Sequence, residues 1–317
     1  MAKQSKTFYF LRILVALLIV VGGGIWLVKT QHSAAEKVLT VLPKFSVDCI
    51  ALVVFLDCLQ ILFMSLRFWL LYPKKHRTLL RNVYAAMSIG QTMNAFLPAR
   101  AGDFYKVATL APKPPVPDFN MLTLTGILTA DKMVDLVSFL VLVFAFGSYK
   151  ENPDFLNSLK SFNWKYLLLA IILMGFSWHF FLKKQLGKIA IWVTQFLKGL
   201  KSLLSTGQLF LALMMALFVW LVEAYALVQL SQYQGYSLSL AQSFFVLTVL
   251  NLAIAVPISV ANIGPFEASI AFALGKFGMP LEVALAIATV HHGLQVIAYI
   301  VSGAIGWVLR QKLRKLS

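Results

Sequence analysis

Residues 94–103 read Asn94-Ala-Phe-Leu-Pro98-Ala-Arg100-Ala-Gly102-Asp103, and residues 255–267 read Ala255-Val-Pro257-Ile-Ser-Val-Ala-Asn262-Ile-Gly264-Pro265-Phe-Glu267. Both stretches place proline, glycine and a carboxylate inside a long apolar region, where a transmembrane helix would be interrupted. A broken backbone is stable at membrane depth only where it is packed in protein or lines a polar cavity. Interrupted segments in matching positions of two halves indicate a transporter binding site. We therefore expect each stretch to form the tip of a re-entrant helical hairpin.

The composition indicates an integral membrane protein. The chain has 317 residues, of which 60% are hydrophobic and 13% are charged, and its mean hydropathy is +0.80. A soluble domain of this length would carry about a quarter charged residues. The net charge of +16 is explained by attraction to anionic membrane lipids, so no nucleic-acid partner is expected.

Four basic blocks that contain no acid predict the topology. The blocks are Lys3/Lys6/Arg12, Lys74/Lys75/Arg77/Arg81, Lys183/Lys184/Lys188/Lys198/Lys201 and Arg310/Lys312/Arg314/Lys315. The positive-inside rule places all four in the cytoplasm. The prediction is therefore a multi-pass protein of the plasma (bacterial inner) membrane with cytoplasmic N- and C-termini.

Six apolar runs are long enough to span a bilayer, which needs about 20 residues. They are residues 8–28, 46–72, 121–147, 164–182, 208–230 and 283–309. If the basic blocks share one side, the interrupted region 79–110 must enter and leave from the cytoplasm, and the region 238–277 from outside. The predicted fold is an all-α polytopic transmembrane helix bundle, with about six spanning helices and two re-entrant hairpins in an inverted-topology repeat. It forms a single domain over residues 1–317, with half-repeats 1–150 and 160–317.

The connector between the halves, residues 183–204, has apolar residues at helical spacing and lysines mostly off that stripe. This pattern predicts an amphipathic helix lying on the inner leaflet. An ordinary connector is the alternative interpretation. The two cysteines, Cys49 and Cys58, are too far apart on one predicted helix for a disulfide, and no metal or other cofactor is expected.

The two hairpin tips carry the candidate binding residues. Gly264 can cap a half-helix that begins at Pro265, with Glu267 three residues after the cap, and the positive end of such a helix attracts anions. In the first tip, Arg100 lies in the turn between two half-helices and can hold a phosphate bidentately. The alternative is that Arg100 pairs with Asp103 and only fixes the turn.

Ionisable residues within the predicted spans are a second signal, because each is costly in lipid unless it is paired or hydrated. They are Asp57, Asp131, Lys132, Asp135, Glu223, His291 and His292. As a set they predict a polar cavity or a proton relay, in which histidine can titrate near neutral pH. A network of internal salt bridges, for example with Arg67 or Arg100, is the alternative.

Asp131 and Asp135 are four residues apart and so share a helix face. In principle such a pair can hold Mg²⁺ and a diphosphate, which would suit a membrane-embedded transferase. The further acidic clusters of such enzymes are missing, and no nucleophile, zinc-protease or phosphate-loop motif is present. The expectation is a protein that is not an enzyme.

At these positions the chain resembles the lysylphosphatidylglycerol synthase transmembrane region, also called the flippase-like domain family. The residues at the positions of the family's signatures are Asn94, Pro98, Arg100, Gly102, Asp103, Lys106, Asp131, Lys132, Asp135, Gly264, Glu267 and His292. Lys106, Lys132 and His292 stand where the family usually has arginine. The large soluble domain that transfers the amino acid in the fused synthases has no counterpart here, so the chain is not expected to make lysyl-lipid.

The resemblance implies a flippase-like body that moves an amphiphilic lipid between leaflets. The substrate-binding residues expected from the tips are Asn94, Arg100, Asp103, Lys106, Asn262, Gly264 and Glu267. The expected partners are anionic membrane lipids. Two alternatives stay open: a non-catalytic partner of an envelope-biogenesis enzyme, and the transferase based on Asp131 and Asp135.

Overall fold

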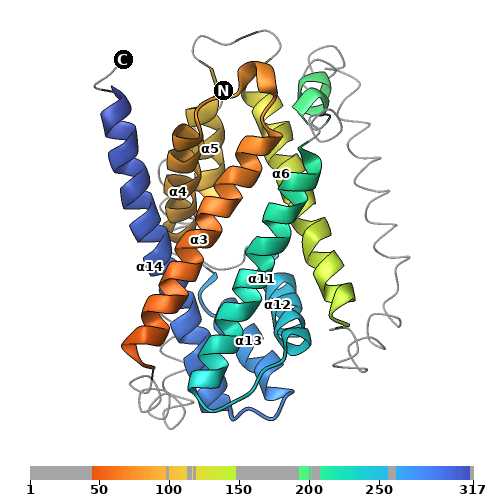
Figure 1. Ribbon diagram of the computed structural model, residues 1–317, viewed down its shortest axis with the longest axis vertical. Coiled ribbons are helices and arrows are strands. Elements are labelled where there is room, and N and C mark those ends of the chain that lie inside the picture. The colour runs from red at the N-terminus through yellow and green to blue at the C-terminus, as the bar shows by residue number, and fades with distance from the viewer. Residues whose placement is uncertain are drawn as a thin grey trace, which may run out of the picture.

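The computed structural model describes residues 45–97, 100–112, 116, 119–147, 193–199, 201, 208–255 and 262–314. The described part is built from helices and contains no strand (Figure 1). The helices are α3 (Val47–Leu71), η2 (Lys74–His76), α4 (Leu80–Phe96), α5 (Ala101–Leu110), α6 (Met121–Ala145), α11 (Leu209–Tyr233), α12 (Leu240–Ile254), α13 (Pro265–Gly275) and α14 (Leu281–Arg314). The spans expected at 8–28 and 164–182 lie outside the described residues, as do Pro98 and residues 256–261.

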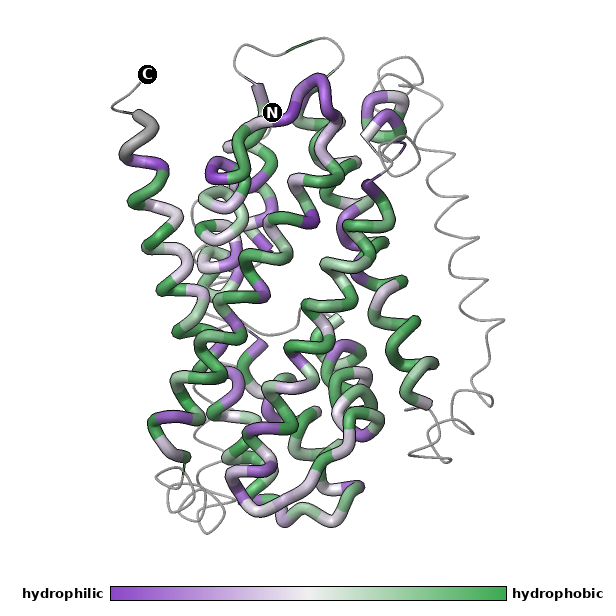
Figure 2. The backbone as a smooth tube through the Cα atoms, viewed as in Figure 1, coloured by the Kyte–Doolittle hydropathy of each residue, from purple (hydrophilic) through white to green (hydrophobic). Residues whose placement is uncertain are grey.

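Three of these helices are long and apolar enough to cross a membrane: α3, α11 and residues Leu281–Gln311 of α14. Helix α6 has the same length as α3 and α11 but carries three charged residues. Its outward face is nevertheless apolar, since Met133, Leu136, Leu140 and Phe144 are exposed. The tube in Figure 2 is predominantly hydrophobic along all four long helices. The chain is therefore an all-α membrane protein.

Local sequence signals explain where several helices begin. Ser46 Oγ accepts from the Cys49 amide at 3.2 Å and caps α3. Asn120 Oδ1 accepts from the amides of Leu122 and Thr123 and caps α6. These side chains satisfy amides that have no partner inside the helix.

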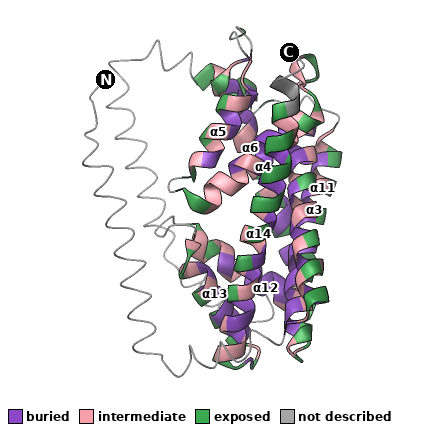
Figure 3. Ribbon diagram, turned by 90° about the vertical axis from the view of Figure 1, so that its left-hand side faces the viewer, coloured by how far each residue is buried: buried purple, intermediate pink, exposed green. Residues whose placement is uncertain are grey.

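Two pairs of short antiparallel helices lie at opposite ends of the molecule. Helices α4 and α5 occupy the upper half of Figure 1, and α12 and α13 occupy the lower half. In both views the connected ends of each pair lie near mid-height and the free ends lie outward (Figures 1 and 3). We call α4 with α5 hairpin one, and α12 with α13 hairpin two.

The pattern of contacts between helices is symmetric between the two parts of the chain. If α3 is exchanged with α11, hairpin one with hairpin two, and α6 with α14, each contacting helix pair maps onto another contacting pair. Corresponding helices also run in opposite directions, since α3 and α14 rise in Figure 1 while α11 and α6 descend. Helices α3 and α11 pack against each other at the centre of this arrangement.

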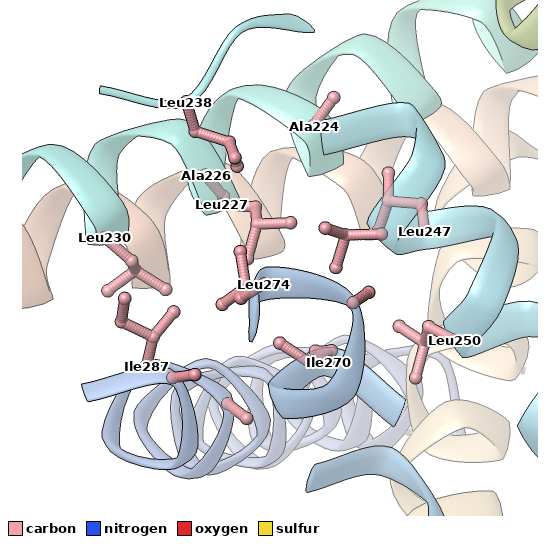
Figure 4. Close-up of a cluster of buried hydrophobic side chains, with 14 of the residues drawn as sticks. Ala224, Ala226, Leu227, Leu230, Leu238, Leu247, Leu250, Ile270, Leu274 and Ile287 are labelled. Carbon is pink, nitrogen blue, oxygen red and sulfur yellow. The ribbon is translucent and has the colours of Figure 1, made fainter. Parts of the chain in front are cut away.

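The larger of the two buried hydrophobic clusters holds hairpin two in place. Leu227 and Leu230 of α11, Leu247 of α12, Leu274 of α13 and Ile287 of α14 converge in it (Figure 4). These side chains are fully or almost fully buried, so they fix α13 between α11, α12 and α14.

Small residues allow very close helix contacts around hairpin one. A Cβ on Gly102 of α5 would lie 1.8 Å from the carbonyl oxygen of Gly90 on α4. A Cβ on Gly303 of α14 would lie 2.3 Å from Thr92 Oγ1, and one on Gly306 would lie 2.2 Å from Ser88 Oγ. Close backbone approach through small residues is a common way for membrane helices to associate, and here it joins α4 to both α5 and α14.

The connector is described only at residues 193–199, which are helical, and at residue 201. Val193 and Leu197 are exposed, and the Thr123 hydroxyl at the start of α6 donates a hydrogen bond to Gln195 Oε1 at 3.2 Å. A position on the inner leaflet stays a prediction.

Candidate functional site

Arg100 forms the tip of hairpin one. It is the N-cap residue of α5 and has φ 53° and ψ 43°, a left-handed conformation that is strained for a side chain other than glycine. Its side chain is 66% exposed, and Nε lies 3.3 Å from Asp103 Oδ2. A strained residue of this kind persists where the surrounding structure imposes it, often at binding sites.

Below this tip, Asp103 organises a buried polar cluster. Lys106 Nζ donates to Asp103 Oδ1 at 2.8 Å and to Gln91 Oε1 at 2.7 Å. Asn94 donates to the same Asp103 oxygen at 3.1 Å. Lys106 is only 1% exposed, so it acts on the tip through Asp103 rather than by facing outward. Lys132 of α6 adds a further electrostatic interaction with Asp103.

Hairpin two has an acid–imidazole pair at the equivalent place. Glu267 Oε2 accepts from the Gly264 amide at 2.7 Å, and Glu267 Oε1 lies 2.6 Å from His292 Nδ1. The His292 ring stacks on Phe266 with 4.3 Å between centroids. Glu267 therefore uses one amide of the helix N-terminus that would otherwise be free for an anion.

The two tips share acids at corresponding positions. Asp103 and Glu267 are each the third residue of their half-helix, α5 and α13. Lys132, which acts electrostatically on Asp103, and His292, the contact of Glu267, are each the twelfth residue of a long helix, α6 and α14 respectively. Asn262, just before the second tip, is left-handed like Arg100, with φ 60°.

A buried ion cluster joins α3 to α6. Arg67 Nε donates to Asp131 Oδ1 at 2.7 Å and Arg67 Nη2 donates to Asp131 Oδ2 at 3.1 Å. Arg67 Nη1 also donates to Asp135. Arg67 and Asp131 are both 0% exposed. The pair Asp131/Asp135, which shares a face as expected, is thus bound to a guanidinium.

A second buried cluster joins α3, α11 and α14 near their middles. Gln60 and Gln295 donate to the two oxygens of Glu223 at 2.7 and 2.6 Å. His291 Nε2 lies 3.3 Å from Glu223 Oε1. Ligand atoms of Asp57, Glu223 and His291 all lie within 4.8 Å of one another.

The candidate residues therefore fall into four groups: the two tips and the two buried clusters. A polar cavity between the tips stays a prediction. One hollow of about 570 Å³ opens beside Tyr72 and Arg310, and another of about 390 Å³ lies between α4 and α14 beside Met93 and Trp307. Neither is lined by a candidate residue.

The sequence does not single out three polar residues of these groups, which are Gln60, Gln91 and Gln295. Gln60 follows Asp57 by three residues and Gln295 follows His291 by four, so each shares a helix face with a candidate. The sequence predicts Arg67 only as a possible salt-bridge partner. Gln60 and Gln295 could have been identified as neutral amides that share a face of an apolar helix with a candidate residue.

This arrangement, with ionisable residues buried between apolar helices, is that of a polytopic membrane protein. The chain belongs to the family of the lysylphosphatidylglycerol synthase transmembrane region, whose profile matches residues 13–303. No curated protein and no solved structure matches the chain. Family membership makes it a membrane protein of lipid-related biosynthesis or translocation, and the matched profile is that of the transmembrane region, not of a soluble catalytic domain.

Proposed function

We propose that this protein moves an anionic, phosphate-bearing lipid, or a lipid-linked intermediate, between the leaflets of the plasma membrane. The observation that carries the proposal is Arg100. Its guanidinium is exposed at the tip of hairpin one, and its only ion-pair partner among the described residues is the nearby Asp103. An exposed pair of this kind contributes about 0–1 kcal/mol, so a phosphate that binds the guanidinium bidentately can replace the carboxylate.

Hairpin one supplies a net positive site for the headgroup. Arg100, Lys106 and Lys132 interact with Asp103. The second acid that acts on Lys106, Asp131, is paired with Arg67, and the amide end of α5 adds a partial positive charge. Asn94 and Lys106 hold Asp103 in place beside Arg100. The acyl tails would stay in the lipid while the headgroup crosses at the tips.

Hairpin two has a different role in this scheme. Glu267 and His292 are partly exposed, at 20% and 12% of their side chains, and lie in direct contact. We assign this pair to proton exchange or to closing the site behind the headgroup. With Asn262 and Gly264 it forms the second tip.

The packing symmetry supports an alternating mechanism. In the proposal, the corresponding helices are the two halves of an inverted repeat, and the two hairpins are re-entrant from opposite sides of the membrane. In this scheme, movement of the two hairpins relative to the central pair α3 and α11 would expose the tips to each leaflet in turn. The termini are placed in the cytoplasm by the basic blocks.

The transferase alternative loses its basis in this arrangement. Asp131 is held by two hydrogen bonds from Arg67, and Asp135 by another. A cation bound by this pair would have to displace or oppose a buried guanidinium. The role of a non-catalytic partner for an envelope enzyme gains no specific observation, so lipid translocation is the function that we carry forward.

The test is translocation of fluorescent phosphatidylglycerol in proteoliposomes, with fluorescent phosphatidylcholine as the zwitterionic comparison. Wild type should accelerate movement of the anionic lipid over empty vesicles, and Arg100→Ala should reduce that rate by about tenfold or more, the size of one charge-assisted contact. Arg81→Ala, an exposed arginine on the same hairpin, is the matched control and should leave the rate unchanged. Wild-type rates in an Arg100→Ala/Glu267→Ala double variant would refute the assignment.

A further inference from the structure

The buried cluster of Asp57, Glu223 and His291 contains polar atoms that lack partners. Asp57 is 2% exposed, and neither of its carboxylate oxygens has a hydrogen-bond partner in the described part of the chain. His291 is 0% exposed, and neither of its ring nitrogens has a hydrogen-bond partner there. Buried carboxylates in apolar surroundings are normally paired or bound to a metal.

The surroundings supply too little positive charge for two carboxylates. Within the described residues, the only ion-pair partner of Glu223 is His291, and Asp57 has none. The nearest guanidinium on the same helix, that of Arg67, is bound to Asp131 and Asp135. The amides of Gln60 and Gln295 solvate Glu223 but carry no charge.

The donor set and its spacing fit a divalent metal ion. Two carboxylates and one imidazole form a ligand set of the kind that zinc and related ions use. Tetrahedral ligands at about 2.1 Å from zinc lie about 3.4 Å from one another. The His291 Nε2 to Glu223 Oε1 distance is 3.3 Å, and the Asp57 ligand atom lies within 4.8 Å of both partners. A small side-chain movement would close the triangle.

We propose that Asp57, Glu223 and His291 bind one divalent ion of the zinc class between α3, α11 and α14. Gln60 and Gln295 fix the Glu223 carboxylate, as outer residues do at metal sites. The ion neutralises the two buried carboxylates and adds a further link between three helices that Gln60 and Gln295 already join through Glu223. With three protein ligands, the fourth coordination position is open to water.

The test measures zinc binding by the full chain, purified in detergent without chelators. Elemental analysis should find one zinc ion per chain, and titration of Zn²⁺ against a competing indicator should give an affinity that Asp57→Asn and Glu223→Gln each lower by at least about tenfold. The control Glu282→Gln changes an acid on α14 outside the cluster and should leave zinc binding unchanged. Absence of zinc binding by folded wild type, or equal affinity in the Asp57→Asn and Glu223→Gln variants, would overturn the proposal.

A second measurement on wild type covers the case in which those variants do not fold. Electron paramagnetic resonance of bound Cu²⁺ should show coupling to a single imidazole nitrogen, that of His291. Coupling to no nitrogen or to several would overturn the site. Both measurements are made without a lipid substrate, so their failure leaves the translocation proposal untouched.

Discussion

Replacing Arg67 by methionine should destabilise the protein more than any surface substitution. Arg67 and Asp131 are both 0% exposed, and the change removes two hydrogen bonds to Asp131, at 2.7 and 3.1 Å, and one to Asp135. Removing one partner of a buried ion pair costs about 3–5 kcal/mol, because the remaining charge is left unpaired. Unfolded chains in a membrane environment also find polar partners, which favours the lower end of that range. We therefore expect a loss of about 3 kcal/mol, or roughly 150-fold in the unfolding equilibrium.

The assay is reversible unfolding by sodium dodecyl sulfate in mixed micelles, followed by tryptophan fluorescence. Trp220 is a suitable reporter because its Nε1 donates to the Asp135 carbonyl at 3.1 Å. Adding Asp131→Asn to the Arg67→Met variant removes the fully buried one of the two carboxylates that lose Arg67 and should restore at least about 1 kcal/mol, a coupling within the range for residues in contact. Arg81→Met, at an exposed arginine, should change stability by about 0.5 kcal/mol or less. A loss under about 1 kcal/mol for Arg67→Met, or additive effects in the double variant, would refute the reasoning.

Two further predictions concern the backbone of hairpin one. Gly102→Ala places a Cβ 1.8 Å from the Gly90 carbonyl oxygen, so it should force α4 and α5 apart at a cost of about 1–3 kcal/mol in the same unfolding assay. Gly275→Ala, where an added Cβ meets nothing within 4 Å, is the control, and equal effects of the two changes would contradict the packing argument. Arg100→Gly should be more stable than Arg100→Ala by about 1 kcal/mol, because glycine adopts φ 53° without strain. Equal melting temperatures for those two variants would show that the left-handed tip is not strained.

Much of the helical framework could be predicted from the sequence. The length of an apolar run and the residues that begin or end a helix are local properties of the sequence. The runs 46–72, 121–147, 208–230 and 283–309 correspond to α3, α6, α11 and α14. Pro265 begins α13 and Arg100 precedes α5, as the turn chemistry indicated. The family resemblance is confirmed over residues 13–303.

The partners within the site could be predicted less well, because they depend on contacts between distant segments. Asp131 and Asp135 were expected to share a face, but their interaction with Arg67 joins residues more than 60 positions apart. The burial of Lys106 depends on how closely α4 approaches α5. The sequence near Lys106 does not indicate the distance between these two helices.

The tight contact between α4 and α14 limits how the molecule can move. Thr92 Oγ1 donates to the Tyr299 carbonyl at 2.6 Å, and Gly303 and Gly306 leave no room for a side chain between the two helices. Arg310, near the far end of α14, also donates to the Tyr105 hydroxyl of α5. Because α14 packs along hairpin one through these contacts, hairpin one cannot move independently of α14. A displacement of the Arg100 tip therefore also moves α14, which carries His291 and His292. Because His292 contacts Glu267 of the second tip, the movements of the two tips are coupled.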